Sequence, residues 1–221
     1  KYKTIIAQEK AKTQILEKIL AAAEEALTAI GRPTHHQHLV KYLNSKTELT
    51  EYREYLTHEI LHAFLLASKK IQQNPFLEWG FSHWPEIKPK RMADKVYVIL
   101  KKYNKPMHFR EIAEYLQKHK FDNKKPHPPT IHNELIADPR FVLIGRGIYG
   151  LADWGYKIGT AAEIVKIILQ EAGRPLPREE IIAKVLAQKK IKRSTILLAL
   201  GKTDGVKQDK SGNYYYLAGK K

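Results

Sequence analysis

The sequence contains no cysteine among its 221 residues. Disulfide bonds, cysteine-based zinc sites and thiol nucleophiles are therefore excluded, and the absence fits a reducing compartment such as the cytoplasm. No stretch approaches the roughly 18 consecutive apolar residues that a membrane-spanning helix needs. Residues 20–29, the most alanine-rich stretch, are interrupted by Glu24 and Glu25. No secretory signal is visible, and a first residue other than Met is expected of a fragment of a longer protein.

Acidic residues are too few to balance the basic ones. Lys and Arg number 39 against 23 Asp and Glu, which gives a formal net charge of +16 at pH 7. An excess of this size favours a polyanionic partner, usually nucleic acid, because binding releases condensed counterions. A generically basic protein without such a partner is the alternative. The hydrophobic fraction of 43% is sufficient for packed cores.

A short pattern centred on proline occurs three times. Apolar residues spaced as one face of a helix precede each proline, and a Gly or Asn two positions before it predicts the end of that helix. An aliphatic residue follows each proline by six positions: Leu39 after Pro33, Ile112 after Pro106 and Ile181 after Pro175. The pattern predicts three related domains, at residues 1–91, 92–159 and 160–221, with linkers at 88–91 and 155–159. The excess of positive charge increases from the first domain to the last.

Two further helices are predicted in each domain. The second helix is expected at residues 109–119 in the middle domain and at 178–188 in the last. The third is expected at about 55–69 in the first domain, at 128–136 in the middle one and at 194–200 in the last. Ser194 is the candidate N-cap of the last of these helices. In the middle domain, the core is expected to contain Ile131, Leu135 and Ile136.

Short β-hairpins are predicted after the third helices. Residues 141–144 and 148–151 form one, joined by the glycine-rich turn 145–147, and residues 206–208 and 214–217 form another. Residues 74–81 show no clean hairpin, so the first domain is expected to have lost its wing. Three helices followed by a hairpin form the winged-helix arrangement. The predicted fold class is therefore mainly α with small β-hairpins (α+β), as a tandem array of three winged-helix-like domains, the first degenerate.

Four motifs in fixed order mark the middle domain: PMHFREIA at residues 106–113, HPPTIHNEL at 127–135, DPRFV at 138–142 and GRGIYGL at 145–151. With them the domain resembles the HARE-type helix-turn-helix family, which includes the N-terminal domain of the bacterial RNA polymerase delta subunit and domains of chromatin and restriction proteins. Residues 81–87 (FSHWPEI), with the two domains behind them, are similar to the C-terminal part of sigma-factor-like proteins. The resemblance implies a role in transcription initiation in the bacterial cytoplasm or nucleoid, with RNA polymerase as a candidate partner.

His58, Glu59 and His62 match the H-E-x-x-H motif of zinc peptidases. On a helix the two histidines share one face and could bind zinc, with Glu59 as general base. The metzincin extension is absent, because Leu65 and Ser68 stand where its glycine and third histidine would be. The segment also coincides with the third helix of the first domain, and a structural role is the favoured interpretation.

Two other motifs have simple structural interpretations. Residues 145–150 match G-x-G-x-x-G, but a dinucleotide site needs a helix to open there, and residues 151–155 do not continue as one. A hairpin turn is favoured. His35, His36 and His38 could bind a metal, but no full ligand set accompanies them, and a polar loop that enters a helix is favoured.

In a winged helix, the third helix enters the major groove and the wing contacts the backbone or minor groove. The candidate DNA contacts in the middle domain are Lys124, Lys125, His127, Thr130, His132, Asn133 and, at the wing tip, Arg146. Those in the last domain are Lys189, Lys190, Lys192, Arg193, Ser194 and Thr195. For the basic run, a solvated face is an equally good interpretation.

The sequence therefore favours a non-enzymatic DNA-binding transcription protein, sigma-factor-like or associated with RNA polymerase. No cofactor, metal or membrane is expected. A module that docks on RNA polymerase without reading DNA is the second hypothesis, and a zinc peptidase built on His58, Glu59 and His62 is the third.

Overall fold

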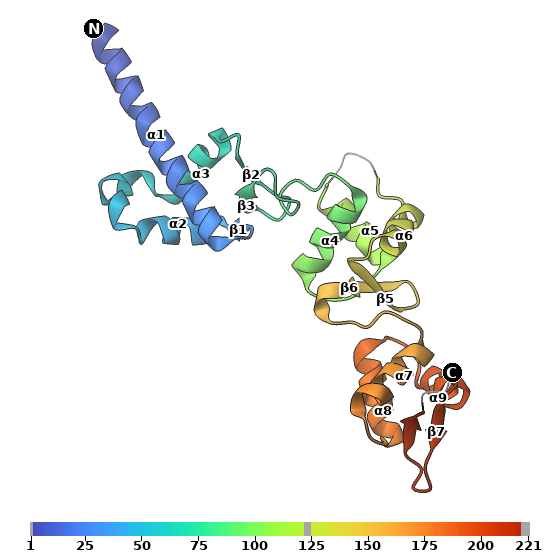
Figure 1. Cartoon of the computed structure of the whole chain (residues 1–221). Helices are drawn as coiled ribbons and strands as arrows, with labels where there is room; N and C mark the ends of the chain where they lie inside the picture. Colours follow the sequence, from blue (N-terminus) through green and yellow to red (C-terminus); the bar gives the residue numbers. More distant parts are fainter. Residues whose placement is uncertain (1, 122–124, 218–221) are drawn as a thin grey trace. The chain divides into compact units, whose positions relative to one another are not determined.

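The computed structural model describes residues 2–121 and 125–217, with side chains from residue 10 onward (Figure 1). The chain divides into two compact units, one made of residues 1–95 with 119–121 and the other of residues 96–118 with 122–221. Both are mainly α-helical with small antiparallel sheets, which confirms the predicted class of mainly α with small β-hairpins; the array of three winged-helix-like domains stays a prediction. Across the described part of the chain, no helix combines the length and apolar character that a bilayer crossing requires.

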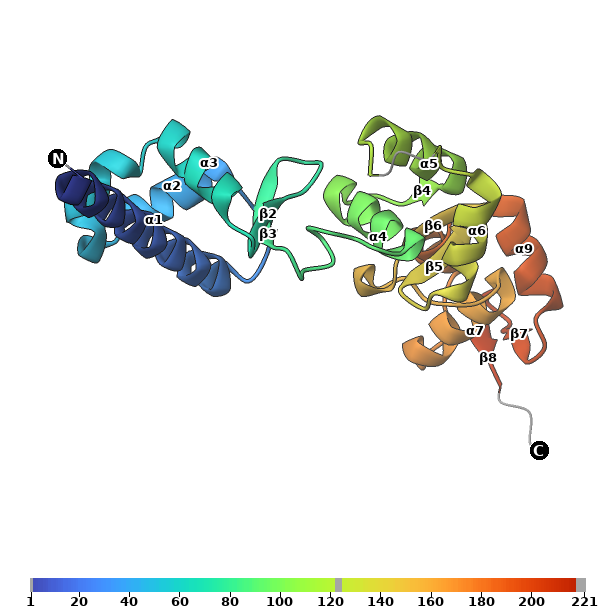
Figure 2. The same cartoon turned by 90° about the horizontal axis from the view of Figure 1, so that it is seen from above.

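The first unit contains a long helix, a short strand, two further helices around a 3-10 segment, and a hairpin. These elements are α1 (Tyr2–Ile30), β1 (Thr34–His35), α2 (His36–Asn44), η1 (Thr47–Tyr55), α3 (His58–Ala67), β2 (Ile71–Gln73) and β3 (Glu78–Phe81). The sheet order is β1-β3-β2, all antiparallel. The second half of α1 packs on α2 and α3 (Figures 1 and 2), and its apolar face shares a buried core with Leu39, Leu61, Leu65 and Trp79.

The hairpin β2–β3 shows that the first wing is present, so the prediction that it has been lost is wrong. The strands pair with Ile71 opposite Phe81 and Gln73 opposite Trp79. The buried Asn74 side chain makes the turn, because its Oδ1 accepts hydrogen bonds from the backbone N–H groups of Phe76 (2.9 Å) and Glu78 (3.0 Å). The hydrogen bonds of the Asn74 side chain thus stabilise this turn, whereas the turn at residues 145–147 contains two glycines.

The second unit begins within α4 (Met92–Tyr103) and contains two groups of elements. The first group continues with β4 (Met107–His108), α5 (Phe109–Lys118), α6 (Pro128–Ala137), β5 (Phe141–Gly145), β6 (Ile148–Leu151) and η2 (Ala152–Trp154). The second contains α7 (Ala161–Ala172), α8 (Arg178–Gln188), α9 (Arg193–Lys202), β7 (Val206–Gln208) and β8 (Tyr214–Tyr216). In this unit the predicted helices and both hairpins lie within one or two residues of their expected bounds; in the first unit, α3 begins three residues after its expected start at about residue 55.

One order of elements recurs along the chain: helix, short strand, two helices, hairpin. The short strand always pairs with the last strand of the hairpin, as β1 does with β3 and β4 with β6. In the last group a single antiparallel bridge, between Leu176 and Tyr214, takes its place. The division into three domains at residues 91/92 and 159/160 stays a prediction.

The turn between β5 and β6 requires glycine at position 147. Gly147 has a φ of +66°, and a Cβ there would lie 2.6 Å from Nε2 of His108. The glycine-rich motif at residues 145–150 therefore forms a hairpin turn and a strand, as the sequence favoured, and β6 rather than a helix follows it.

Replacing Asn74 with alanine is expected to lower the free energy of unfolding of the first unit by about 1–3 kcal/mol, because two part-buried N–H groups lose their acceptor. Denaturation followed by tryptophan fluorescence in a Trp154→Phe background isolates this unit, since Trp79 and Trp84 both belong to it. Gln37→Ala removes an exposed amide from α2 and should change stability by less than about 0.5 kcal/mol. Equal stability of the two variants would contradict the role given to Asn74.

Candidate nucleic-acid interface

Helix α6 presents both polar and apolar side chains to solvent. It begins at two prolines, and the side chains of His127 and Thr130 share a hydrogen bond of 3.2 Å between Nδ1 and Oγ1 at its start. Ile131 and Leu135 are buried as predicted. Ile136 was also expected in the core and is 66% exposed, so that prediction is wrong. One face of a ten-residue helix contacts the core, and Ile136 lies beyond its edge.

Four predicted contact residues on α6 or just before it are exposed, namely Lys125, His127, Thr130 and Asn133. Lys124 lies outside the described residues. His132 is half-buried instead, because its ring stacks on Phe109 with centroids 4.6 Å apart and meets the Tyr149 ring edge-on at 5.8 Å. The structure thus gives His132 a packing role between α6, α5 and β6.

Arg146 is exposed at the tip of the β5–β6 hairpin, between two glycines. The neighbouring residue Gly145 belongs to a junction with the last group of elements. It forms a parallel bridge with Lys190, whose backbone N–H donates to the carbonyl of Ile144 at 2.6 Å. The wing therefore points its tip to solvent while its β5 strand pairs with the segment that precedes α9.

Lys189 belongs to the same junction and is only 6% exposed. Its ammonium Nζ donates to the carbonyl oxygen of Leu143 at 2.5 Å. Burial lowers the pKa of this group, and the negative charge of Glu163 opposes that shift. Because the cation is covered, Lys189 holds the junction together in this structure and does not present its charge to a ligand.

The remaining basic residues before and within α9 lie on the surface. Lys190, Lys192, Ser194 and Thr195 are exposed. Arg193 is exposed too, but its guanidinium is paired with both carboxylate oxygens of Glu179. The helix begins at Arg193 with Lys192 as its N-cap residue, so the prediction of Ser194 as N-cap is wrong. Ser194 and Thr195 lie in the first turn, where the helix N-terminus favours a phosphate oxygen; the backbone N–H of Thr195 itself donates to the Lys192 carbonyl at 2.9 Å.

The sequence pattern did not identify two lysines of the last hairpin as candidate DNA contacts. Lys207 on β7 and Lys210 in the turn after it are both exposed. Their positions correspond to the wing that carries Arg146 in the preceding group. Aligning the hairpins of the repeats, rather than only their prolines, would have found them.

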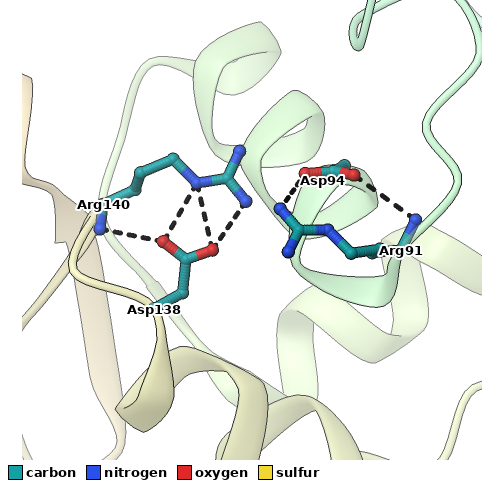
Figure 3. Close-up of polar contacts among 4 residues, drawn as sticks. All are labelled: Arg91, Asp94, Asp138 and Arg140. Carbon is teal, nitrogen blue, oxygen red and sulfur yellow. Dashed lines mark hydrogen bonds and ion pairs between the residues drawn. The ribbon is translucent and has the colours of Figure 1, made fainter.

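The arginines at either end of the segment 91–140 are paired with carboxylates (Figure 3). Arg140 donates to Asp138 from its backbone N–H at 3.0 Å and from Nη2 at 2.6 Å, and its guanidinium lies 5.2 Å from the centre of the Tyr97 ring. The backbone N–H and side chain of Arg91 both contact Asp94, at 3.3 and 3.5 Å. These arginines shape the fold, which fits their absence from the predicted contact residues.

Of the two H-E-x-x-H histidines, His62 is partly buried on α3 and His58, the first residue of the helix, is exposed. The ring of His62 meets Trp79 edge-on at 5.5 Å, and the ring of His36 lies 4.2 Å from that of His58. His36 is buried, where a polar loop was expected, and its Nε2 bonds the carbonyl oxygen of His58 at 2.9 Å. Within residues 10–121 and 125–217, no three His, Asp or Glu side chains are grouped as a metal site requires.

The family comparison agrees with this geometry. Residues 91–154 match the HARE-HTH family, whose model is described as a helix-turn-helix domain of ASXL and restriction endonuclease proteins, among others. The matched HARE-HTH segment contains α4, α5, α6 and the β5–β6 hairpin, and its similarity to a winged-helix type of DNA-binding domain supports a DNA-binding role. A search of curated proteins finds no match to the chain.

Lowering the pH is expected to destabilise the first unit through His36. Burial and then the charge of His58 lower the pKa of His36 below the ordinary 6.5, and His62 adds to the effect, against Glu59 and the bond to the His58 carbonyl. Below pH 6.5 the unfolded chain thus binds more protons than the folded one, and stability is lost as the pH falls toward the lowered pKa.

Urea midpoints between about pH 7.5 and pH 5, read from tryptophan fluorescence, measure this slope. His36→Phe should flatten it, whereas His83→Gln, at an exposed position, should leave it as in the wild type. An unchanged slope in His36→Phe would refute the assignment.

Gly145→Ala is expected to open the junction at Lys190. A Cβ at this position would lie 2.7 Å from the carbonyl oxygen of Lys190, so the two backbones must move apart. Hydrogen exchange at the Lys190 amide should then accelerate. The control is Gly201→Ala in α9, where a Cβ meets nothing within 4 Å; it should not accelerate this exchange. If the Lys190 amide exchanged as slowly in Gly145→Ala as in the wild type, the close backbone contact between Gly145 and Lys190 would be contradicted.

Proposed function

We propose that this chain is a non-enzymatic transcription protein that binds duplex DNA through α6, the β5–β6 wing and the first turn of α9. The match of residues 91–154 to HARE-HTH carries the proposal. The exposed polar and basic side chains support it, because Lys125 lies just before α6, Thr130 and Asn133 lie on it, and the wing offers Arg146. Phosphate contacts by such groups fix the register, and Asn133 is suited to a bidentate contact with adenine.

The same proposal places the protein beside RNA polymerase in a bacterial cytoplasm or nucleoid. Its support is the resemblance of residues 81–87 and the following domains to the C-terminal part of sigma-factor-like proteins. The net charge of +16 is consistent with steering toward promoter DNA.

A docking module on RNA polymerase is the second candidate, and the apolar surface beside the wing favours it. A hollow of about 730 Å³ in the second unit is lined by Ile136, Leu143 and Ile158, which are 66%, 50% and 73% exposed. Exposed aliphatic side chains grouped in this way are typical of protein interfaces. This surface and the basic residues of α9 can serve the two partners together.

Salt-titrated binding of fluorescein-labelled duplex DNA tests the proposal. The logarithm of affinity should fall steeply and linearly with the logarithm of salt concentration. Arg146→Gln and Lys192→Gln should each reduce the magnitude of the slope by about 1, because each removes one phosphate contact. Lys184→Gln is the control, since it removes a cation of α8 that lies 3.8 Å from Glu180 and outside the proposed interface.

A flat salt response, or no duplex binding, would overturn the DNA-binding proposal. Retention of core RNA polymerase on the immobilised chain after nuclease treatment would then support the docking module in its place. Retention together with a steep salt response supports both halves of the first proposal.

A further inference from the structure

The hairpin β7–β8 has one face on the core and one face toward solvent. Its register places Val206 opposite Tyr216, Lys207 opposite Tyr215 and Gln208 opposite Tyr214. Val206, Tyr214 and Tyr216 pack against the buried cluster of α7, α8 and α9. Because side chains alternate along a strand, Lys207 and Tyr215 share the opposite face.

The three consecutive tyrosines differ in what they contact. The hydroxyl of Tyr214 accepts a hydrogen bond of 3.4 Å from Arg178, and the ammonium of Lys166 lies 4.9 Å from the centre of the Tyr216 ring. Tyr215 is partly buried, and among the described residues its side chain has neither a hydrogen-bond partner nor a ring neighbour. Its ring thus lies at the surface with part of it open to solvent and its hydroxyl without a hydrogen-bond partner in this part of the chain.

A hollow of about 490 Å³ is lined on one side by Tyr215 and Tyr216 of β8. The turn after α7 forms its other side, with Gly173 and Arg174, together with Leu169, Gln170 and Pro175. Gly173 has a φ of +61° and nothing lies within 4 Å of where its Cβ would be, so the hollow is open at this point. The Arg174 guanidinium contacts Glu180 at 3.2 Å and remains 61% exposed.

Cations without a partner surround the same face. Lys207 lies directly across the ladder from Tyr215, and Lys210 follows in the turn. Neither has a carboxylate partner in the described ranges. The turn is held in shape by Asp209, whose Oδ1 accepts from the N–H groups of Ser211 and Asn213, both at 2.9 Å.

We propose that this face, made of Tyr215, Lys207, Lys210 and Arg174, binds single-stranded nucleic acid by stacking an unpaired base on Tyr215. The lysines and Arg174 would neutralise the adjoining phosphates. A surface aromatic ring flanked by cations is an arrangement that holds single strands, because every base offers a π-face. In a duplex these faces are covered by neighbouring base pairs, so duplex DNA cannot use the ring. The inference rests on the proposed function for its ligand class and uses a different surface.

Fluorescence anisotropy on the full chain tests it, with labelled 12-mers of oligo(dT) and oligo(rU) and a 12-base-pair duplex at one salt concentration. Tyr215→Ala should weaken binding of the single strands roughly tenfold or more and leave duplex affinity unchanged. Tyr215→Phe should retain single-strand affinity, because the ring remains. Lys207→Gln should weaken single-strand binding more than Lys184→Gln, which removes the same charge from α8.

The outcomes separate the two proposals. Unchanged single-strand affinity in Tyr215→Ala, or no single-strand binding by the wild type, overturns the stacking site while duplex binding still supports the proposed function. Loss of duplex binding in the wild type overturns the proposed function instead. Equal weakening of duplex and single strand by Tyr215→Ala also overturns the inference, because it shows a general effect on the fold. Preference between the oligo(dT) and oligo(rU) arms identifies which single strand is the ligand.

Discussion

Backbone pairing between the short segment after each first helix and the last strand of each hairpin is the contact on which the recurring fold depends. In the last group it is reduced to two hydrogen bonds of 2.8 Å, in which Leu176 and Tyr214 each donate to the other's carbonyl. This pairing joins residues far apart in the sequence and fixes the hairpin against the helices. The third helix is thereby held against the core by one face, and its other face is left to solvent. Such an exposed helix beside a wing is what a DNA groove accommodates.

Much of this arrangement follows from the sequence because its signals are local. The period of apolar residues fixes α5, α6, α8 and α9, and glycines at the turns fix two hairpins. The hairpin β2–β3 was missed because the Asn74 side chain replaces the glycine signal. The short strands β1 and β4 contain two residues each, which is too few for any alternating pattern to show.

The candidate interface was less predictable, because exposure of a charged side chain depends on distant contacts. Lys189 belongs to the same basic run as Lys190 and Lys192, yet it is buried through a bond to Leu143, 46 residues away in the sequence. Arg193 is paired with Glu179 on another helix, and His132 packs on Phe109. Conversely, Ile136 satisfies the helical period and is exposed. The sequence identifies the basic segment. Tertiary contacts determine which of its cations are exposed and unpaired, and so able to bind a ligand.

Nuclear magnetic resonance provides the most direct test of the central claim, that the chain binds duplex DNA through its second unit. In a titration of isotope-labelled chain with duplex DNA, we expect amide shifts at Thr130 and Asn133, at Arg146, and at residues 190–195. The amides of α3 and of Trp79 should not shift. Shifts confined to residues 1–91, or none in residues 92–217 at saturating DNA, would contradict duplex binding by the second unit.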